Sequence, residues 1–216
     1  MNKPLFANRT EAGKALAQKL LPYRDRDDVL VLAVPRGGVP VAFEVSQALR
    51  APIETVVVRR LGLPGREEFA MGAIASGGIE IRNKEIIDIL SITSETVDKI
   101  RDEELHELER RERAYRGDVN WPRYKADIAI LVDDGLATGY SMRVAIEAIR
   151  NLDTHKIIVA IPVAAADSLE AIASLVDETV CLATPTPFNN VSQWYEDFQQ
   201  VSDEEVHHLI QLKWRP

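Results

Sequence analysis

The chain has 216 residues, a formal net charge of −8 and 46% hydrophobic residues. A chain of this length can bury a sizeable core and suits one domain, or one domain with a small appendage. The acidic balance argues against a general nucleic-acid binder, which needs a basic face to neutralise phosphates. A local basic pocket remains compatible with it.

The first part of the chain alternates helix and strand. Residues 10–22 carry apolar residues on one helical face, with Thr10 as the expected N-cap. Residues 29–34 and 53–58 are short apolar runs typical of buried strands, and a helix is expected over 39–49 between them. This strand–helix–strand pattern predicts a parallel sheet with right-handed crossovers.

The turn from Pro35 to Pro40 is a candidate anion site. It follows a strand, and open α/β sheets bind ligands at the carboxyl ends of their strands. Arg36 offers a forked cation for phosphate, and Gly37 and Gly38 allow close backbone approach because they lack a Cβ. The alternative is a glycine turn that only reverses the chain.

The second strand runs into Arg59 and Arg60 and then into a Gly/Pro-rich stretch, residues 61–65. This order predicts a mobile loop beside an anion site. Alternatively, both arginines only solvate the end of the strand. Residues 71–75 and 79–81 are expected to form a hairpin around a Ser-Gly-Gly turn.

Residues 94–116 read as a long, highly charged helix with a thin apolar stripe. One interpretation is a solvated arm or lid held by ion pairs between residues four positions apart. The other is that Arg110, Arg111 or Arg113 swings over the site as part of a lid.

Residues 127–143 carry the most informative pattern of the chain. A buried strand over 128–132 ends at Asp133 and Asp134, and a small-residue turn then leads into a helix. Such a turn forms a phosphate cradle, because free backbone N–H groups converge there and the helix dipole favours an anion. The alternative is an acidic pair that merely caps the strand.

The two carboxylates lie one turn away from this cradle and can accept hydrogen bonds from a diol. A phosphate site beside a diol site describes a ribose 5-phosphate. Neighbouring residues on a strand point to opposite faces, so one of Asp133 and Asp134 should face the ligand directly.

After the motif, strands are expected over 156–161 and 179–183, with a helix over 165–175 between them. Pro162 should end the first of these strands. Ser202 starts a capping box that opens a last helix.

Phe188 and Trp194 follow a proline-containing segment near the end of the chain. Aromatic faces of this kind stack on flat heterocycles. The alternative is that both rings are core or dimer-contact residues.

The single cysteine, Cys181, cannot form an internal disulfide and fits a small hydrophobe in a reducing compartment. The four histidines show no ligand spacing, so no structural metal is expected. Without an 18-residue apolar run or a signal-peptide core, the sequence predicts a soluble, cytoplasmic protein.

The stretch over residues 128–142 resembles the signature of type I phosphoribosyltransferases. In that family an apolar strand, an acidic pair, two aliphatics and a Thr-Gly-x-Thr/Ser turn bind phosphoribosyl pyrophosphate (PRPP). Gly135 departs from the pattern, since an aliphatic usually stands there; it either loosens the strand end or lets the backbone approach a ligand. The chain looks closest to bacterial members whose acceptor is not obvious.

The resemblance covers most of the chain and is specific only at residues 130–142. It implies a doubly wound α/β fold with a mostly parallel sheet in one domain, residues 1–216. The core would span about 27–183, a charged helical arm about 93–117, and a small C-terminal hood about 184–216.

The implied activity is that of a transferase of nucleotide metabolism, a glycosyltransferase of the pentosyl class. A nitrogen nucleophile would displace pyrophosphate from C1 of PRPP. The resemblance assigns catalysis to Asp133 and Asp134, the 5-phosphate to Ala137, Thr138, Gly139, Tyr140 and Ser141, pyrophosphate to Arg36, Gly37, Gly38 and Arg59, and acceptor stacking to Phe188 and Trp194.

The implied cofactor is magnesium, held through the substrate's own oxygens with no direct protein ligand. The implied partners are PRPP and a nitrogenous, nucleobase-like acceptor, with no nucleic acid and no membrane; a homodimer is a further option. The main alternative is a PRPP- or nucleotide-sensing regulator of the same fold that does not turn over. An unrelated phosphate-receiver domain would carry its acidic cluster at the first strand, which this sequence does not.

Overall fold

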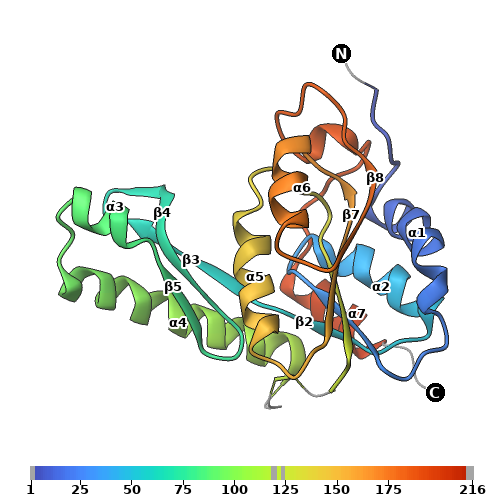
Figure 1. Ribbon diagram of the computed structural model, residues 1–216, viewed down its shortest axis with the longest axis horizontal. Coiled ribbons are helices and arrows are strands. Elements are labelled where there is room, and N and C mark those ends of the chain that lie inside the picture. Colours follow the sequence, from blue (N-terminus) through green and yellow to red (C-terminus); the bar gives the residue numbers. More distant parts are fainter. Residues whose placement is uncertain (1–2, 118–120, 123–124, 213–216) are drawn as a thin grey trace.

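The computed structural model describes residues 3–117, 121–122 and 125–212, with residues 67 and 68 described by their backbone alone. Within these residues a five-stranded parallel sheet has the order β2-β1-β6-β7-β8 (Figure 1). Its strands are β1 (Val29–Ala33), β2 (Ile53–Thr55), β6 (Ile128–Val132), β7 (Lys156–Val163) and β8 (Glu178–Ala183). The predicted α/β class with a mostly parallel sheet is therefore confirmed.

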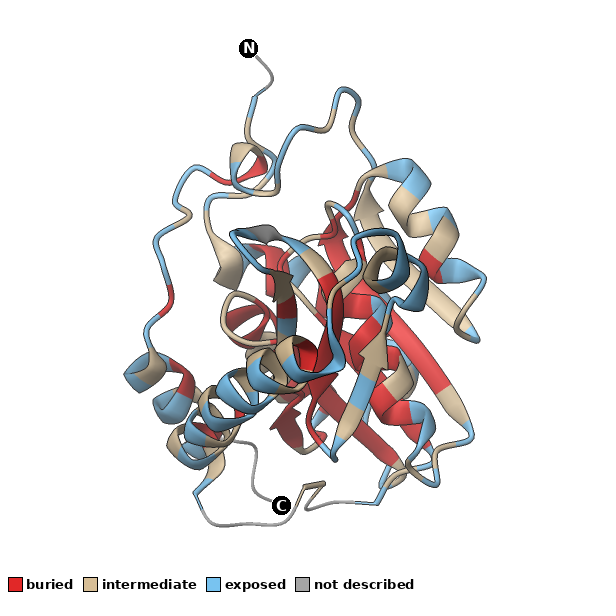
Figure 2. Cartoon of the chain, turned by 90° about the vertical axis from the view of Figure 1, so that its left-hand side faces the viewer, coloured by how far each residue is buried: buried red, intermediate tan, exposed pale blue. Residues whose placement is uncertain are grey.

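Helices cover both faces of this sheet (Figure 1). On one face lie α1 (Arg9–Leu20), α2 (Gly38–Leu49) and α7 (Asp203–Gln211), and on the other α5 (Tyr140–Arg150) and α6 (Ala166–Ala173). Val29 and Val31 of β1 join the first apolar cluster, and Leu30 and Leu32 join the second. Burial on both faces explains why this strand reads as a continuous apolar run, and the buried residues of Figure 2 gather in the sheet.

The part of the chain that follows β2 and precedes β6 forms an arm that projects from the core (Figure 1). A three-stranded antiparallel sheet and two helices build it: β3 (Val58–Leu63), β4 (Arg66–Ala75), β5 (Ile79–Arg82), α3 (Lys84–Ile89) and α4 (Ser94–Arg116). The hairpin expected at residues 71–81 is confirmed. The loop expected over residues 61–65 is wrong for residues 61–63, because β3 continues to Leu63 and pairs with β4 around a buried Leu61; Pro64 and Gly65 form the turn into β4.

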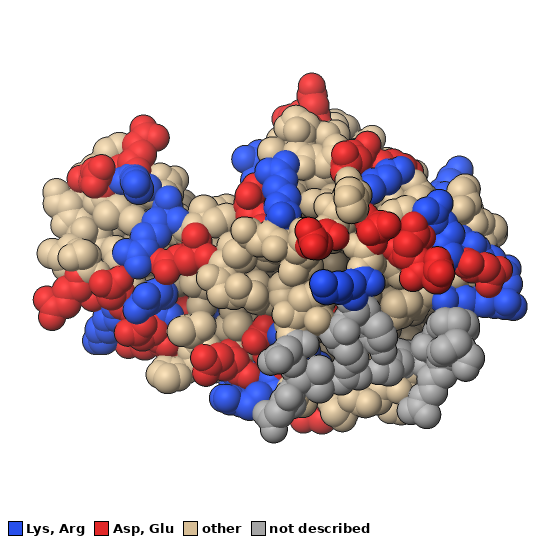
Figure 3. Space-filling model, turned by 60° about the horizontal axis from the view of Figure 1, so that its bottom comes forward, with Lys and Arg blue, Asp and Glu red and all other residues tan. Residues whose placement is uncertain are grey.

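The long helix α4 is confirmed over residues 94–116, and its expected i,i+4 ion pairs join Arg111 to Glu107 and Arg116 to Glu112. Figure 3 shows acidic and basic side chains interspersed over the face that it draws. Among the described residues, no helix has an apolar stretch long enough to cross a membrane.

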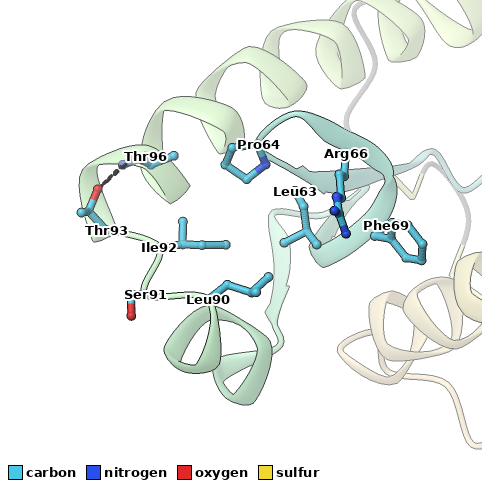
Figure 4. Close-up of a pocket in the computed structure, with 9 residues that line it drawn as sticks. All are labelled: Leu63, Pro64, Arg66, Phe69, Leu90, Ser91, Ile92, Thr93 and Thr96. Atoms are coloured by element: carbon cyan, nitrogen blue, oxygen red, sulfur yellow. Dashed lines mark hydrogen bonds between the residues drawn. The ribbon is translucent and has the colours of Figure 1, made fainter.

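The tip of the arm holds a cavity of about 670 Å³ that is lined by residues of the arm. Leu63 from β3 and Phe69 from β4 line it, together with Leu90 and Ile92 from the link between α3 and α4 (Figure 4). Phe69 is 56% exposed and Leu90 53%. The arm therefore carries apolar side chains that its own packing does not cover.

Two local predictions were wrong by a few residues. Asn8, not Thr10, caps α1, because its side chain accepts a hydrogen bond from the backbone N–H of Glu11 at 2.9 Å. Pro162 does not end β7, which continues to Val163. The last residue pair between β6 and β7 is Val132 with Ala160. Pro162 lies beyond that pair, so its lack of a backbone N–H costs no hydrogen bond to β6.

The N-terminal segment before α1 pairs with the hood around Trp194 and Tyr195. The segment before α1 forms a bridge between Phe6 and Tyr195, and the backbone N–H of Leu5 donates to the carbonyl oxygen of Trp194 at 2.9 Å. Short 3-10 turns follow α1 (Leu21–Tyr23) and precede this contact (Ser192–Trp194). A small apolar cluster of Ala12, Val163, Trp194 and Tyr195 holds the meeting point together.

Candidate functional site

The two candidate turns lie side by side at one edge of the sheet. β1 and β6 are neighbouring parallel strands, with Ala33 paired to Val132. The strand order reverses between them, because β2 lies beyond β1 while β7 and β8 lie beyond β6. Such a switch point leaves a crevice at the carboxyl ends of the strands, which is where open α/β sheets bind ligands. The structure therefore brings the turn after Pro35 against the acidic pair.

Gly37 and Gly38 pack so closely on the acidic pair that neither position has room for a side chain. A Cβ built on Gly37 lies 2.0 Å from Oδ2 of Asp134, and one built on Gly38 lies 2.8 Å from the carbonyl oxygen of Val132. The backbone of Gly37 is helical, with φ of −60°, so its conformation does not require glycine. Glycine is required there because the close contact with Asp134 leaves no space for a Cβ.

Gly37→Ala should lower the free energy of unfolding by about 1 to 3 kcal/mol, the usual cost of overpacking. The new methyl group would clash with the buried carboxylate of Asp134, which an ion pair with Arg9 holds in place. Urea unfolding measures the loss. In an Asp134→Ala background the same substitution should cost clearly less, and an equal cost in both backgrounds would show that this contact is not the cause.

Asp134 is held in a buried network by residues from both ends of the chain. Its Oδ2 accepts a hydrogen bond from Nε of Arg9 at 2.7 Å, with the two side chains 13% and 11% exposed. Tyr195 donates its hydroxyl to the carbonyl oxygen of Asp134 at 2.5 Å. Sequence analysis missed Arg9 and Tyr195, because these contacts span 125 and 61 residues and no local pattern marks them.

Asp133 is the more open member of the pair. It is half-buried, and its Oδ1 accepts a hydrogen bond from the backbone N–H of Asp134 at 2.8 Å. Burial, and then the charge of Asp134, raise the pKa of Asp133 well above its usual range. Burial also raises the pKa of Asp134, although Arg9 opposes that rise. The two carboxylates thus have different surroundings, as alternation along a strand predicts.

The turn that leads into α5 has the geometry of an anion cradle. Gly139 caps the helix with a left-handed φ of +72°, and within the described residues no side chain caps its N-terminus. The first N–H groups of α5 therefore lack a capping partner, and the helix dipole favours a negative charge beside them. Ser168 steadies the turn by donating to the carbonyl oxygen of Ala137 at 2.5 Å, and Thr138 is exposed.

A cavity of about 820 Å³ lies between the arm and the core. Pro35 and Ser141 line it from the two turns, and Arg59 and Arg60 line it from β3. From α4 it receives Arg111, one of the three arginines considered for a lid, besides Glu103 and Glu104. Of the predicted site residues, Arg59 and Ser141 line this cavity, whereas Asp133 and Arg36 are not among its lining residues.

Both arginines expected to bind pyrophosphate are paired with carboxylates. Arg59 donates from Nε to Oε2 of Glu104 at 2.6 Å. Nη1 of Arg36 lies 3.8 Å from Oδ1 of Asp203, which also accepts a hydrogen bond from the hydroxyl of Tyr115 at 2.7 Å. A phosphate that binds either arginine has to compete with these carboxylates.

The hood explains the unusual glycine of the motif. A Cβ on Gly135 would lie 2.4 Å from Cγ1 of Val191. Neither a loosened strand nor a ligand is needed to account for this glycine, because the side chain of Val191 occupies the space.

The two hood aromatics are placed differently. Trp194 is 3% exposed and packs with Tyr195 in the small cluster at the chain ends. Phe188 is partly exposed, with its ring centroid 6.1 Å from that of Trp194. This placement favours the packing alternative for Trp194, and acceptor stacking stays a prediction for Phe188.

Two comparisons with known sequences identify the family of this chain. Residues 5–198 match the family described as the phosphoribosyl transferase domain. Curated relatives from two strains of Mycobacterium tuberculosis, each named "putative phosphoribosyl transferase", are 40% identical over 202 residues. That alignment covers 94% of this chain and 45% of each relative, so the chain spans about half the length of these relatives.

Among solved structures, a crystal structure of a Thermus thermophilus protein superposes with a TM-score of 0.79 and 32% identity. The superposition covers 98% of this chain and 99% of that one. The family match over residues 5–198 and relatives 40% identical across nearly the whole chain show that this chain belongs to the phosphoribosyl transferase domain family.

Proposed function

We propose that this protein transfers the phosphoribosyl group of PRPP to a nitrogenous, nucleobase-like acceptor and releases pyrophosphate. One observation carries the proposal: at the switch point of the sheet the half-buried Asp133 is followed by an uncapped helix N-terminus, whose Ser141 lines a cavity together with Arg59 and Arg60. These features suit the three parts of PRPP, namely the 5-phosphate, the ribose diol and the pyrophosphate.

In this proposal the turn from Ala137 to Ser141 binds the 5-phosphate. Its backbone N–H groups at the start of α5 act as donors, and the hydroxyls of Thr138 and Ser141 add to them. Ser141 also lines the cavity between arm and core. A phosphate bound at this turn would thus direct the rest of PRPP toward the arginines of β3.

Arg36, Gly37, Gly38 and Arg59 receive the pyrophosphate. Each arginine then exchanges a carboxylate partner, Asp203 or Glu104, for phosphate oxygens. Guanidinium groups bind phosphate through paired hydrogen bonds, which makes this exchange favourable for a doubly charged phosphate.

Asp133 accepts hydrogen bonds from the ribose hydroxyls and faces the ring as it becomes cationic. The transition state of such a displacement resembles an oxocarbenium ion, so catalysis rests on positioning and on a preorganised negative charge rather than on a covalent nucleophile. Asp134 supports Asp133 from the buried side, where Arg9 compensates its charge.

Magnesium suits this site, because the open donors are oxygens. Mg²⁺ keeps several waters and is bound through one or two carboxylates together with substrate phosphates. Asp133 at the strand end and Glu103 and Glu104 in the cavity lining offer such oxygens to the waters of the ion. When bound, the ion would neutralise the leaving pyrophosphate, and the protein would hold it through the substrate and water.

The test combines binding and turnover. Isothermal titration with PRPP should show binding that Mg²⁺ strengthens, and a panel of purines, pyrimidines and other nitrogen heterocycles should include one that releases pyrophosphate. Binding without turnover for any acceptor would favour the sensing regulator instead. No heat and no thermal shift at millimolar PRPP would contradict both functions.

Arg36→Ala should weaken PRPP and pyrophosphate by about tenfold and leave ribose 5-phosphate nearly unchanged, because the lost charged hydrogen bond is worth about 1.5 kcal/mol or more. Titration calorimetry with the three ligands measures this. Arg110→Ala is the matched control, since Arg110 also pairs with Asp203, at 3.0 Å, from the exposed side of α4. Equal losses for all three ligands would contradict the assignment of Arg36.

A further inference from the structure

Arg9 lies far from the family motif in sequence, yet its guanidinium touches the acidic pair. We propose that Arg9 is a positioning residue: it makes Asp134 a fixed, charge-compensated support and leaves Asp133 as the carboxylate open to ligand. The role of Asp133 toward a ligand rests on the proposed function. The contacts of Arg9 and the main test of its role do not depend on PRPP.

Three contacts fix the Arg9 guanidinium in one orientation. Nε donates to Asp134 at 2.7 Å, and Nη1 donates to the carbonyl oxygen of Gln199 at 2.8 Å. The guanidinium carbon lies 3.7 Å from the ring centroid of Phe198. Arginine suits this place because its planar fork can form directed hydrogen bonds while its face stacks on a ring. The contacts with Gln199 and Phe198 come from the hood, so the hood fixes the position of Arg9 and Arg9 fixes that of Asp134.

The same ion pair supports the neighbouring turn. A Cβ on Gly37 would lie 2.0 Å from Oδ2 of Asp134 and 3.3 Å from Nε of Arg9. The backbone after Pro35 thus rests on the Arg9–Asp134 pair. A shift of Arg9 would therefore change the carboxylate and the candidate pyrophosphate turn together.

Charge explains why the pair needs such a partner. The buried carboxylate of Asp134 and the half-buried one of Asp133 repel each other, and without a cation one of them tends to keep a proton. The titratable groups that face Asp134 are Arg9 from α1, Asp133 from the same strand end and Tyr195 from the hood. Arg9 is the cation of this set, so it is the group that allows Asp134 to stay ionised beside Asp133.

The direct test follows the aspartate carboxyl carbons by ¹³C NMR in the ligand-free protein as pH is varied. In Arg9→Gln the titration of the Asp133–Asp134 pair should move to higher pH. Lys14→Gln is the matched control, because Lys14 lies on the same helix and its ion pair with Glu11 is exposed; it should leave the titration unchanged. An unmoved titration in folded Arg9→Gln would overturn the proposal and leave Arg9 as a structural contact only.

Phe198→Leu is the milder variant, needed if Arg9→Gln does not fold. It keeps both charges and removes the ring under the guanidinium, so the titration should move in the same direction by less. An unmoved titration in this variant, with the thermal midpoint lowered, would also count against positioning.

Turnover of PRPP adds a second measurement at pH 6 and pH 8. Arg9→Gln should release pyrophosphate about tenfold more slowly at pH 6 than the wild type, which is the factor that one unit of pKa represents, and the deficit should shrink at pH 8. The same deficit at both pH values would contradict a role through ionisation. If the wild type does not bind PRPP, the proposed function fails while the carboxyl titration still decides the role of Arg9.

Discussion

Asp133→Asn should lower the rate of pyrophosphate release from PRPP by about 10²-fold or more and leave the fold intact. Asparagine keeps the shape of the side chain and can still accept a hydrogen bond from the backbone N–H of Asp134. What it removes is the negative charge that a cationic transition state would meet. Loss of one preorganised charge-stabilising group typically costs this factor in turnover.

The measurement compares turnover, PRPP affinity and thermal midpoint between the wild type and the variant. Turnover should fall while PRPP affinity changes little, because the charge matters most after bond breaking begins. Wild-type turnover should also fall as pH drops through the raised pKa of Asp133, since protonation removes the same charge. Asp127→Asn, an exposed carboxylate just before the same strand, is the matched control. A lower midpoint with unchanged activity per folded molecule would make Asp133 a strand cap.

The sequence was informative where a feature depends on neighbours along the chain. The apolar run at residues 128–132 became β6 with its predicted bounds, and Ser202 caps α7 as its capping box indicated. Both depend on short-range periodicity or on hydrogen bonds within a few residues. The motif also located the turn around Gly139, because glycine there provides the left-handed φ that the turn needs.

Features that depend on contacts between distant segments could not be predicted from the sequence. Residues 61–65 looked like a loop because of Gly and Pro, yet pairing with β4 makes most of them strand. Glu104 pairs with Arg59 from a helix that was read mainly as a solvated face. The reason for Gly135, a side chain 56 residues later, could not be deduced without the fold. Local patterns report local geometry, and tertiary contacts decided these cases.

Asp134→Asn should have the opposite signature to Asp133→Asn: a large loss of stability. Asp134 is the buried partner of Arg9, and removing one member of a buried ion pair leaves the other charge uncompensated. We expect the free energy of unfolding to fall by about 2 to 3 kcal/mol, near the low end of that class. Arg9 keeps its contacts with Phe198 and Gln199, and Asp133 loses a repulsive neighbour.

For a chain of this length such a loss corresponds to a fall in the thermal midpoint on the order of 5 to 10 °C. A double-mutant cycle with Arg9→Met isolates the pair, because the Arg9→Met, Asp134→Asn double variant has no unpaired charge at this position. If the ion pair is the cause, the double variant should lose clearly less stability than the sum of the two single losses. Simple additivity would mean that Asp134 is stabilised by something other than Arg9, and the division of the acidic pair into a buried support and an open carboxylate would have to be abandoned.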